Sequence, residues 1–338
     1  MVKQDDVLSS EVAIAGKLEA DGLTLKAKSR AVAAIDRLVG SVADWPAAYF
    51  EGRAAKRRLK DEHERRLMEA QALIAEQQMP GHHELGVILI NDVLKDQARK
   101  KANAACVAAE AIEELKALPA PDASDGQATE SEPDAAIDED WMNQFTRYAE
   151  DASSEQLQQI WGRVLAGEVR KPGSFSRQAL RFIAELDRET AEDCELLGKH
   201  VVGDWVLKDE KWNEGELFLI SIELQRLGLI EGVGLGGPSR QFVIQSSGMN
   251  GVVGRQWGVL VRGNPGVELS FDILTLTRLG RQVMSLVNTA DEPACLRELA
   301  VKMNKAGLHS IALGRAVRQG AGWIIALPHE TLWEAPQA

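Results

Sequence analysis

Polar and charged residues that could bind a ligand gather around one turn, at positions 171–174. Serine hydroxyls and the N–H groups that begin the following helix could accept an anion there, beside cationic side chains. In the second interpretation, which we favour, Gly173 and the serines only turn the chain and cap the next helix. The candidate partner- or anion-binding residues are Arg163, Glu168, Arg170, Lys171, Ser174 and Ser176.

Other residue types that support catalysis lack the spacing they need. Cys106, Cys194 and Cys295 show no C-x-x-C pattern, which is typical of a reducing cytoplasm and excludes a structural zinc site. Residues 232–237 read G-x-G-x-x-G, but Pro238 and a β-type run follow, whereas a dinucleotide site needs a helix there. We therefore expect a flexible turn or wing tip, no catalytic residue, no cofactor and no metal, and a protein that is not an enzyme.

Charge limits the nucleic-acid hypothesis. The formal net charge of −12 argues against phosphate binding over the whole surface. Eight of the acidic residues, and no basic ones, lie between positions 120 and 140, so much of the acidity belongs to one segment. Nucleic acid stays an alternative partner through a wing whose arginines would contact phosphate. These candidates are Arg226, Arg240, Arg255 and Arg262.

The first third of the chain is predicted to be helical. Residues 1–50 hold two amphipathic pieces, and the second, 31–45, places Ile35, Leu38, Val39, Val42 and Trp45 on one face. A charged helix over 51–78 ends at Pro80–Gly81, and another helix follows over 83–118.

Each of these two long helices carries a narrow apolar stripe, so we expect them either to fold back on each other as an antiparallel hairpin or to join those of another subunit as a coiled coil. Self-association into a homo-oligomer is the expected outcome. An alternative is peripheral attachment to a membrane surface through residues 31–66. The predicted oligomerisation seam consists of Leu59, Leu67, Ile74, Ala98, Ala102, Ala105, Ala109 and Ile112.

The remainder divides by composition. Residues 119–137 are acidic and poor in large apolar side chains, which predicts a linker. Residues 138–202 predict a helical module, with caps at Ser153 and Asp187. Residues 203–338 predict a winged-helix-like α+β domain, with Thr277 capping a helix after the strands. The fold class expected is mainly α with a C-terminal α+β part.

The block IWGRVLAGEVRKPGSFSRQALRFIAELDRETAE, residues 160–192, resembles domain-of-unknown-function family 2806, whose members show W-x-R-[IV]-L-A-G-E followed by P-G-S-F-S. The charged helix before it, the acidic segment and residues 276–280 resemble that family in their order. The resemblance covers most of residues 50–290 and is strongest over 138–195. It implies an architecture and a bacterial setting but no reaction, and it hints at a role in phage defence.

These observations together favour a non-enzymatic, oligomeric interaction or scaffold protein of the bacterial cytoplasm. Its expected partners are further copies of itself and another protein. The alternatives are a nucleic-acid-binding regulator and a peripheral membrane protein. A signal peptide and an apolar run of ~18 residues are both missing from the sequence, so secretion and a membrane span are not expected.

Overall fold

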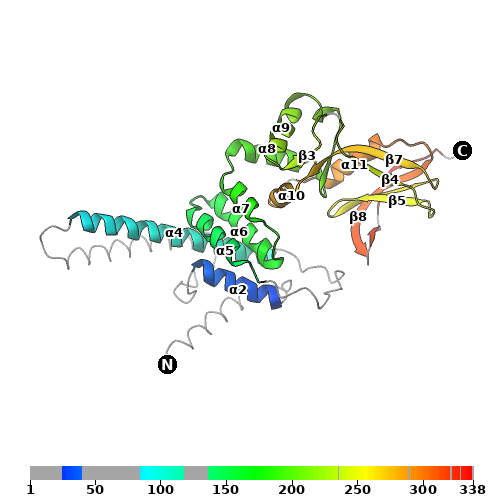
Figure 1. Ribbon diagram of the computed structural model, residues 1–338. Coiled ribbons are helices and arrows are strands. Elements are labelled where there is room, and N and C mark those ends of the chain that lie inside the picture. The colour runs from blue at the N-terminus through cyan, green and yellow to red at the C-terminus, as the bar shows by residue number, and fades with distance from the viewer. Residues whose placement is uncertain are drawn as a thin grey trace. The chain divides into compact units, whose positions relative to one another are not determined.

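The computed structural model describes residues 25–39, 84–117, 136–234, 236–287, 290–319, 322–327 and 329–336, with the side chains of the second segment described from position 92. These residues form two compact units, which Figure 1 shows. Unit 1 holds the described residues up to Leu180, and unit 2 those from Arg181 onward. Among the described residues, no helix is long and apolar enough to cross a bilayer.

Unit 1 is a bundle of helices built around α4. Its elements are α2 (Leu25–Val39), α4 (Glu84–Ala117), α5 (Glu139–Asp151), α6 (Glu155–Arg170) and the first half of α7 (Arg177–Ala184). Helix α4 packs along α6 and α5, and α2 packs on α4 and α6. Small side chains on α4, among them Ala105 and Ala108, are fully buried and let the neighbouring helices approach closely.

Several predicted helices of this unit are confirmed, with shifted ends. The helix expected over 83–118 is α4. The helix expected over 31–45 begins earlier, as α2, and its Ile35, Leu38 and Val39 are buried as predicted. Val42, Trp45, the charged helix over 51–78 and most of the acidic linker lie outside the described residues.

The serine cap before α6 lies one residue later than predicted. Ser154, not Ser153, accepts a hydrogen bond from the Leu157 N–H at 3.2 Å.

Unit 2 combines helices with antiparallel strands. After the second half of α7 its elements are α8 (Arg188–Gly198), β1 (Val201–Val202), β2 (Trp205–Leu207), η3 (Glu210–Trp212), α9 (Gly215–Arg226), β3 (Ile230–Glu231), β4 (Ser239–Val243), β5 (Met249–Val253), β6 (Trp257–Gly263), β7 (Glu268–Leu276), α10 (Arg278–Met284), α11 (Glu292–Lys302), β8 (Leu308–Gln319), β9 (Gly322–Ile325) and β10 (Glu330–Glu334). Asp187 and Thr277 cap α8 and α10, as predicted.

The strands of unit 2 form two sheets around one core. The first has the order β1-β2-β7-β3, with β4 pairing the outer half of the long β7. The second has the order β10-β8-β6-β5, with β9 pairing the end of β8. Buried side chains from both sheets meet those of α11, such as Leu296 and Leu299. Helix α11 thus closes the core against strands from distant parts of the chain.

The described residues therefore have a mixed α+β fold, with the helical unit first, as the fold-class prediction had it in outline. The sequence predicts strands at 241–244, 257–262, 267–276 and 323–327, and β4, β6, β7 and β9 lie there. Strand β8 had no counterpart in the prediction. Its sequence, LHSIALGRAVRQ, mixes Ala, Gly and Arg with few β-branched residues, and its pairing with β6 and β10 decides its conformation.

Candidate functional site

The turn after α6 is organised by the buried side chain of Glu168. Its Oε1 accepts a hydrogen bond from the Gly173 N–H at 2.6 Å, and its Oε2 accepts one from the Phe175 N–H at 3.0 Å. Only 2% of this residue is exposed. Burial raises the pKa of Glu168, and the backbone N–H groups of the turn offset part of that rise. The carboxylate therefore replaces water as the acceptor for this turn.

Side chains around the turn fix it against the helices. Phe175 is buried, and its carbonyl oxygen accepts a hydrogen bond from the Trp141 indole at 2.7 Å. Gly167 makes room for the Phe175 ring, because a Cβ at that position would lie 2.7 Å from it. Gly173 has a φ of 84°, which favours glycine. Glycine at 167 and 173, glutamate at 168 and phenylalanine at 175 thus each have a structural reason.

Close packing also accounts for an aromatic residue and a glycine on α6. The Trp161 ring lies 5.7 Å from Phe145, edge to face, and stacks on Tyr148 at 5.4 Å. Gly162 allows α6 to touch α4, because a Cβ there would lie 2.5 Å from the Glu110 Cβ. These contacts, with those of Glu168, explain the residue types at Trp161, Gly162 and Glu168.

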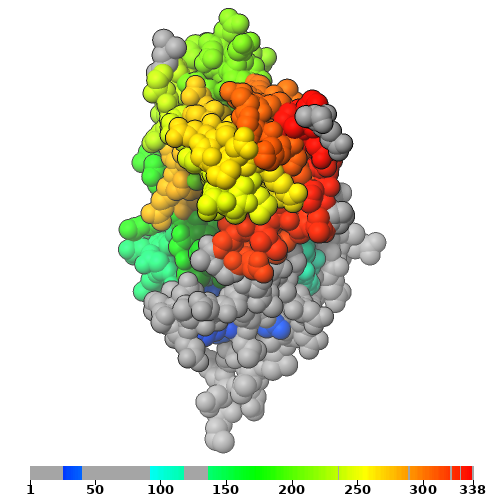
Figure 2. Space-filling model, turned by 90° about the vertical axis from the view of Figure 1, so that its right-hand side faces the viewer, coloured from blue at the N-terminus to red at the C-terminus, as the bar shows by residue number. Residues whose placement is uncertain are grey.

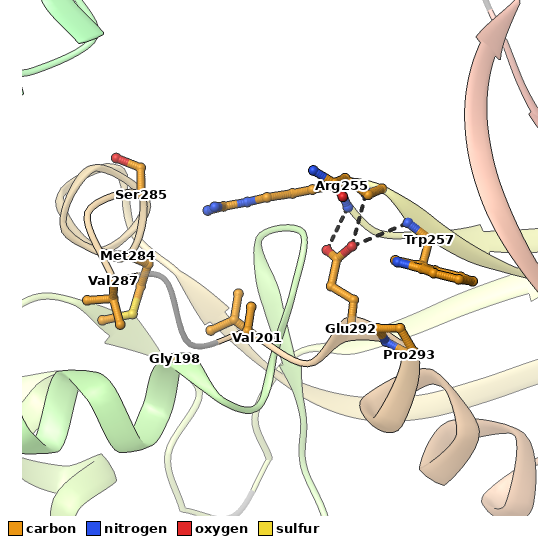
Figure 3. Close-up of a pocket in the computed structure, with 11 residues that line it drawn as sticks. Gly198, Val201, Arg255, Trp257, Met284, Ser285, Val287, Glu292 and Pro293 are labelled. Atoms are coloured by element: carbon orange, nitrogen blue, oxygen red, sulfur yellow. Dashed lines mark hydrogen bonds between the residues drawn. The ribbon is translucent and has the colours of Figure 1, made fainter. Parts of the chain in front are cut away.

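A pocket of about 220 Å³ lies in unit 2, where the β5–β6 turn faces the end of α10 and the start of α11 (Figure 3). Glu292, the first residue of α11, is 6% exposed and forms part of the lining. Its Oε1 accepts hydrogen bonds from the N–H groups of Gly203 at 3.1 Å and Arg255 at 2.6 Å. Its Oε2 accepts from those of Gln256 at 2.9 Å and Trp257 at 3.3 Å. One carboxylate thus ties two turns to a helix.

The wall of this pocket is partly apolar. Val201 and Met284 are buried, and Val287 is half-buried. Figure 3 shows the side chain of Arg255 extending across the pocket from the β5–β6 turn toward Ser285 and Val287. Neither Glu292 nor this pocket was predicted. The sequence signal was weak, an acidic residue before Pro293 at a helix start, which also fits an ordinary helix N-terminus.

Comparison with protein families matches residues 93–208 to the family described as protein of unknown function (DUF2806). The turn at Gly173 lies within the matched residues, and we call it the DUF2806 turn. The resemblance predicted from the sequence is thereby confirmed over this range, which runs from α4 to the residue after β2. The charged helix and residues 276–280, which suggested a wider match, lie outside the matched residues. No curated protein and no solved structure matches the chain significantly.

The predicted anion site coincides with the DUF2806 turn, and the structure places internal partners on it. Glu168 occupies the Gly173 and Phe175 N–H groups, while the Ser174 N–H donates to the Lys171 carbonyl at 3.1 Å. Ser176 accepts from the Ala179 N–H at 3.2 Å and so caps α7. These contacts agree with the favoured interpretation, in which the serines and the glycine turn and cap the chain.

The cationic candidates of the DUF2806 turn do not converge on one point. Arg163 lies 4.0 Å from the carboxylate of Glu114 on α4. The Arg170 guanidinium donates to the Leu115 carbonyl at 3.4 Å, and burial lowers its pKa. Lys171 is exposed at the end of α6.

The predicted nucleic-acid arginines lie on separate elements. Arg226 pairs with Glu223 on α9 at 3.0 Å, and Arg240 on β4 lies over the Trp205 ring, 5.6 Å from its centroid. Arg255 precedes β6 and Arg262 lies near the end of that strand, roughly 20 Å away along an extended chain. The structure therefore does not bring the four together.

The described part of the predicted oligomerisation seam is buried within unit 1. Ala102, Ala105, Ala109 and Ile112 are all buried, on the helix that packs along α5 and α6 of the same chain. Ala98 is half-buried, and Leu59, Leu67 and Ile74 lie outside the described residues.

Residues of the other predicted motifs also have structural partners. The G-x-G-x-x-G loop leads into β4, and the Lys208 ammonium donates to the carbonyls of Gly232, at 2.9 Å, and of Gly234. Burial raises the pKa of the Cys194 thiol to about 12 and that of Cys295 to about 11. Among the described residues, no group of three or more His, Cys, Asp or Glu side chains is arranged to hold a metal ion.

Proposed function

We propose that the chain is a non-enzymatic interaction protein that assembles with copies of itself through the β8–β9 strand pair of unit 2. The observation that carries this proposal is the exposure of large apolar side chains on both faces of that pair. Val317 and Ile324 lie opposite each other across the two strands and are 41% and 44% exposed. Trp323 on the opposite face is 50% exposed, and Leu327 beyond β9 is 79% exposed. The surface of β5, β6 and β8, in yellow to red, faces the viewer in Figure 2.

The free edge of β9 supports pairing with another strand. In the part of the chain that the structure describes, β9 pairs with β8 alone, so its other edge presents backbone N–H and C=O groups. Proteins usually protect such an edge with charge, proline or a bulge. The sequence of β9, GWII, has neither charge nor proline. An apolar, unprotected edge of this kind favours burial against another strand.

A second copy of the chain fits this edge. Two uncharged β9 strands can pair antiparallel about a twofold axis without placing like charges opposite each other. Self-association was predicted through the helices of the first third. The described part of that seam packs against α5 and α6 of the same chain, so we assign self-association to β9 instead.

A second interaction surface supports a protein partner over nucleic acid. The order α8, β2, α9, β3, β7, with β7 between β2 and β3, supports a winged-helix-like core in unit 2. In such a core α9 takes the place of the helix that contacts DNA. Its Leu219 is 66% exposed, and Glu216 is exposed on the same helix. An apolar and acidic helix suits a protein surface better than phosphate.

The membrane alternative has less support on the described part of its segment. Ile35, Leu38 and Val39 of α2 are buried in unit 1, so this stripe is not available to lipid. A bacterial setting, a cytoplasmic location and a role in phage defence stay predictions made from the sequence.

Light scattering of the full chain over a dilution series tests the proposal. We expect a mass that is a multiple of 36.9 kDa. Ile324→Lys should weaken self-association by about tenfold or more, because it places like charges at the paired edge. Val301→Lys is the matched control, since Val301 is 76% exposed on α11, away from β9. A single protomer at every concentration, or equal effects of the two variants, would refute the proposal.

A further inference from the structure

The pocket beside Glu292 has the size of a small-ligand site. Its volume is about 220 Å³, and it lies between the β5–β6 turn, the end of α10 and the start of α11. An apolar cavity of ~150 Å³ holds a benzene ring, so this pocket has room for roughly ten non-hydrogen atoms. Its elements come from three parts of the chain, and Glu292 fixes two of them to each other.

The two charged side chains of the lining differ in the hydrogen-bonding groups that remain available for a ligand. Each carboxylate oxygen of Glu292 already accepts two backbone N–H groups. The carboxylate also packs tightly against the β5–β6 turn: a Cβ on Gly254 would lie 2.5 Å from its Oε1. Glu292 is therefore a structural group, with its acceptor sites directed at the backbone.

Arg255 offers unused donors. Its backbone N–H bonds Glu292, but no acceptor among the described residues bonds its guanidinium, which extends across the pocket (Figure 3). Its neighbour Arg315, by contrast, lies 4.7 Å from the Trp257 ring centroid and donates to the Gln256 side chain at 3.1 Å. The planar guanidinium of Arg255 has the geometry to bind a carboxylate through two parallel hydrogen bonds.

The other lining residues determine which ligand body and which net charge fit the pocket. Val201, Met284 and Val287 offer apolar contact below and beside the guanidinium. The negative charge of Glu292 in the lining opposes a doubly charged ligand more than a singly charged one. A singly charged oxyanion with an apolar body therefore fits better than inorganic phosphate.

We propose that this pocket binds a small monocarboxylate, with the carboxylate on the Arg255 guanidinium and the apolar body against Val201, Met284 and Val287. Binding there would couple the end of α10 to the β5–β6 turn through the ligand. No residue of β8 or β9 lines this pocket, so its ligand binding can be tested independently of the proposed self-association.

Calorimetric titration of the full chain with benzoate, benzamide and inorganic phosphate tests this site. Benzoate should bind with a Kd on the order of 1 mM, as expected for so small a ligand. The neutral benzamide and inorganic phosphate should each bind at least about tenfold more weakly, because one lacks the charge and the other the apolar body.

Two variants separate the pocket from other surfaces. Arg255→Met should weaken benzoate binding by about tenfold or more, while it keeps the backbone N–H that Glu292 needs. Arg262→Met is the matched control, an exposed arginine near the far end of β6, and should leave binding unchanged. Absence of benzoate binding at ~10 mM, equal binding of benzamide or phosphate, or unchanged binding in Arg255→Met would overturn the proposal.

Discussion

Glu168 in unit 1 and Glu292 in unit 2 are both buried carboxylates that accept hydrogen bonds from loop N–H groups, but they differ in reach. Glu168 bonds residues five and seven positions further along the chain. Glu292 bonds residues 35 to 89 positions away, in two separate turns. The first carboxylate shapes a turn next to its own helix, whereas the second joins segments that the chain brings together only on folding.

The difference in reach predicts a difference in what each carboxylate stabilises. Removal of Glu168 leaves a turn that its flanking helices still hold close to its place. Removal of Glu292 takes away four hydrogen bonds that join the turns at Gly203 and Arg255 to the start of α11. Both carboxylates therefore stabilise the fold, but unit 2 should depend more on Glu292 than unit 1 does on Glu168.

The largest effect is expected for Glu292→Gln. The amide keeps the shape but presents an N–H₂ group to N–H donors, so that at least two of them lose their acceptor. This should destabilise unit 2 by roughly 4 kcal/mol, measured by urea unfolding. The matched control is Glu298→Gln, an exposed glutamate on the same helix, which should cost less than about 1 kcal/mol. Equal losses in the two variants would remove the special role of Glu292.

A smaller effect is expected for Glu168→Gln, roughly 2 kcal/mol for a turn with two such bonds. Burial raises the pKa of Glu168 above its ordinary value of 4.5, so the folded state binds more protons than the unfolded state. The contribution of this group to stability is thus complete below pH 4.5 and falls as the pH rises through the raised value.

The E168Q variant does not titrate at this position, so the stability difference between wild type and variant should shrink as the pH rises above 4.5. Unfolding by urea at a series of pH values, followed by far-ultraviolet circular dichroism, measures this trend. A difference that grows with pH would show that the hydrogen bonds outweigh burial in setting the pKa.

Effects of equal or smaller size concern the glycines of unit 1. Gly162→Ala should cost about 2 kcal/mol, because its Cβ would lie 2.5 Å from the Glu110 Cβ where α6 crosses α4. Gly173→Ala should cost only about 1 kcal/mol, since the space around it is open and the strain of its positive φ is the main term. Thermal unfolding of both variants ranks them. The reverse order would mean that the turn, and not the helix contact, limits unit 1.

The same contrast explains how much the sequence revealed. The caps at Asp187 and Thr277, helix α4 and the turn at Gly173 depend on neighbours within a few residues, and local patterns predicted each of them. Glu168 was chosen as a candidate for the same reason, although its role as an acceptor for the turn was not assigned. Features that depend on residues close together in the sequence could therefore be predicted from it.

Features that depend on distant pairing were missed. Strand β8 has a sequence that fits no strand pattern well, and its partners β6 and β10 decide its conformation. Glu292 looks like an acidic residue at a helix start, because its hydrogen-bond donors lie far away in the sequence. The open edge of β9 depends on which strands pair, and no local pattern reports that.

Hydrogen exchange of the Gly203, Arg255 and Gln256 amides, compared between wild type and the E292Q variant, tests the central claim most directly. The control is Pro293→Ala, which changes the next residue of α11 but none of the hydrogen bonds. If the buried carboxylate holds these turns, their amides should exchange about a hundredfold faster in E292Q and at nearly wild-type rates in P293A. Unchanged exchange in E292Q would contradict the account.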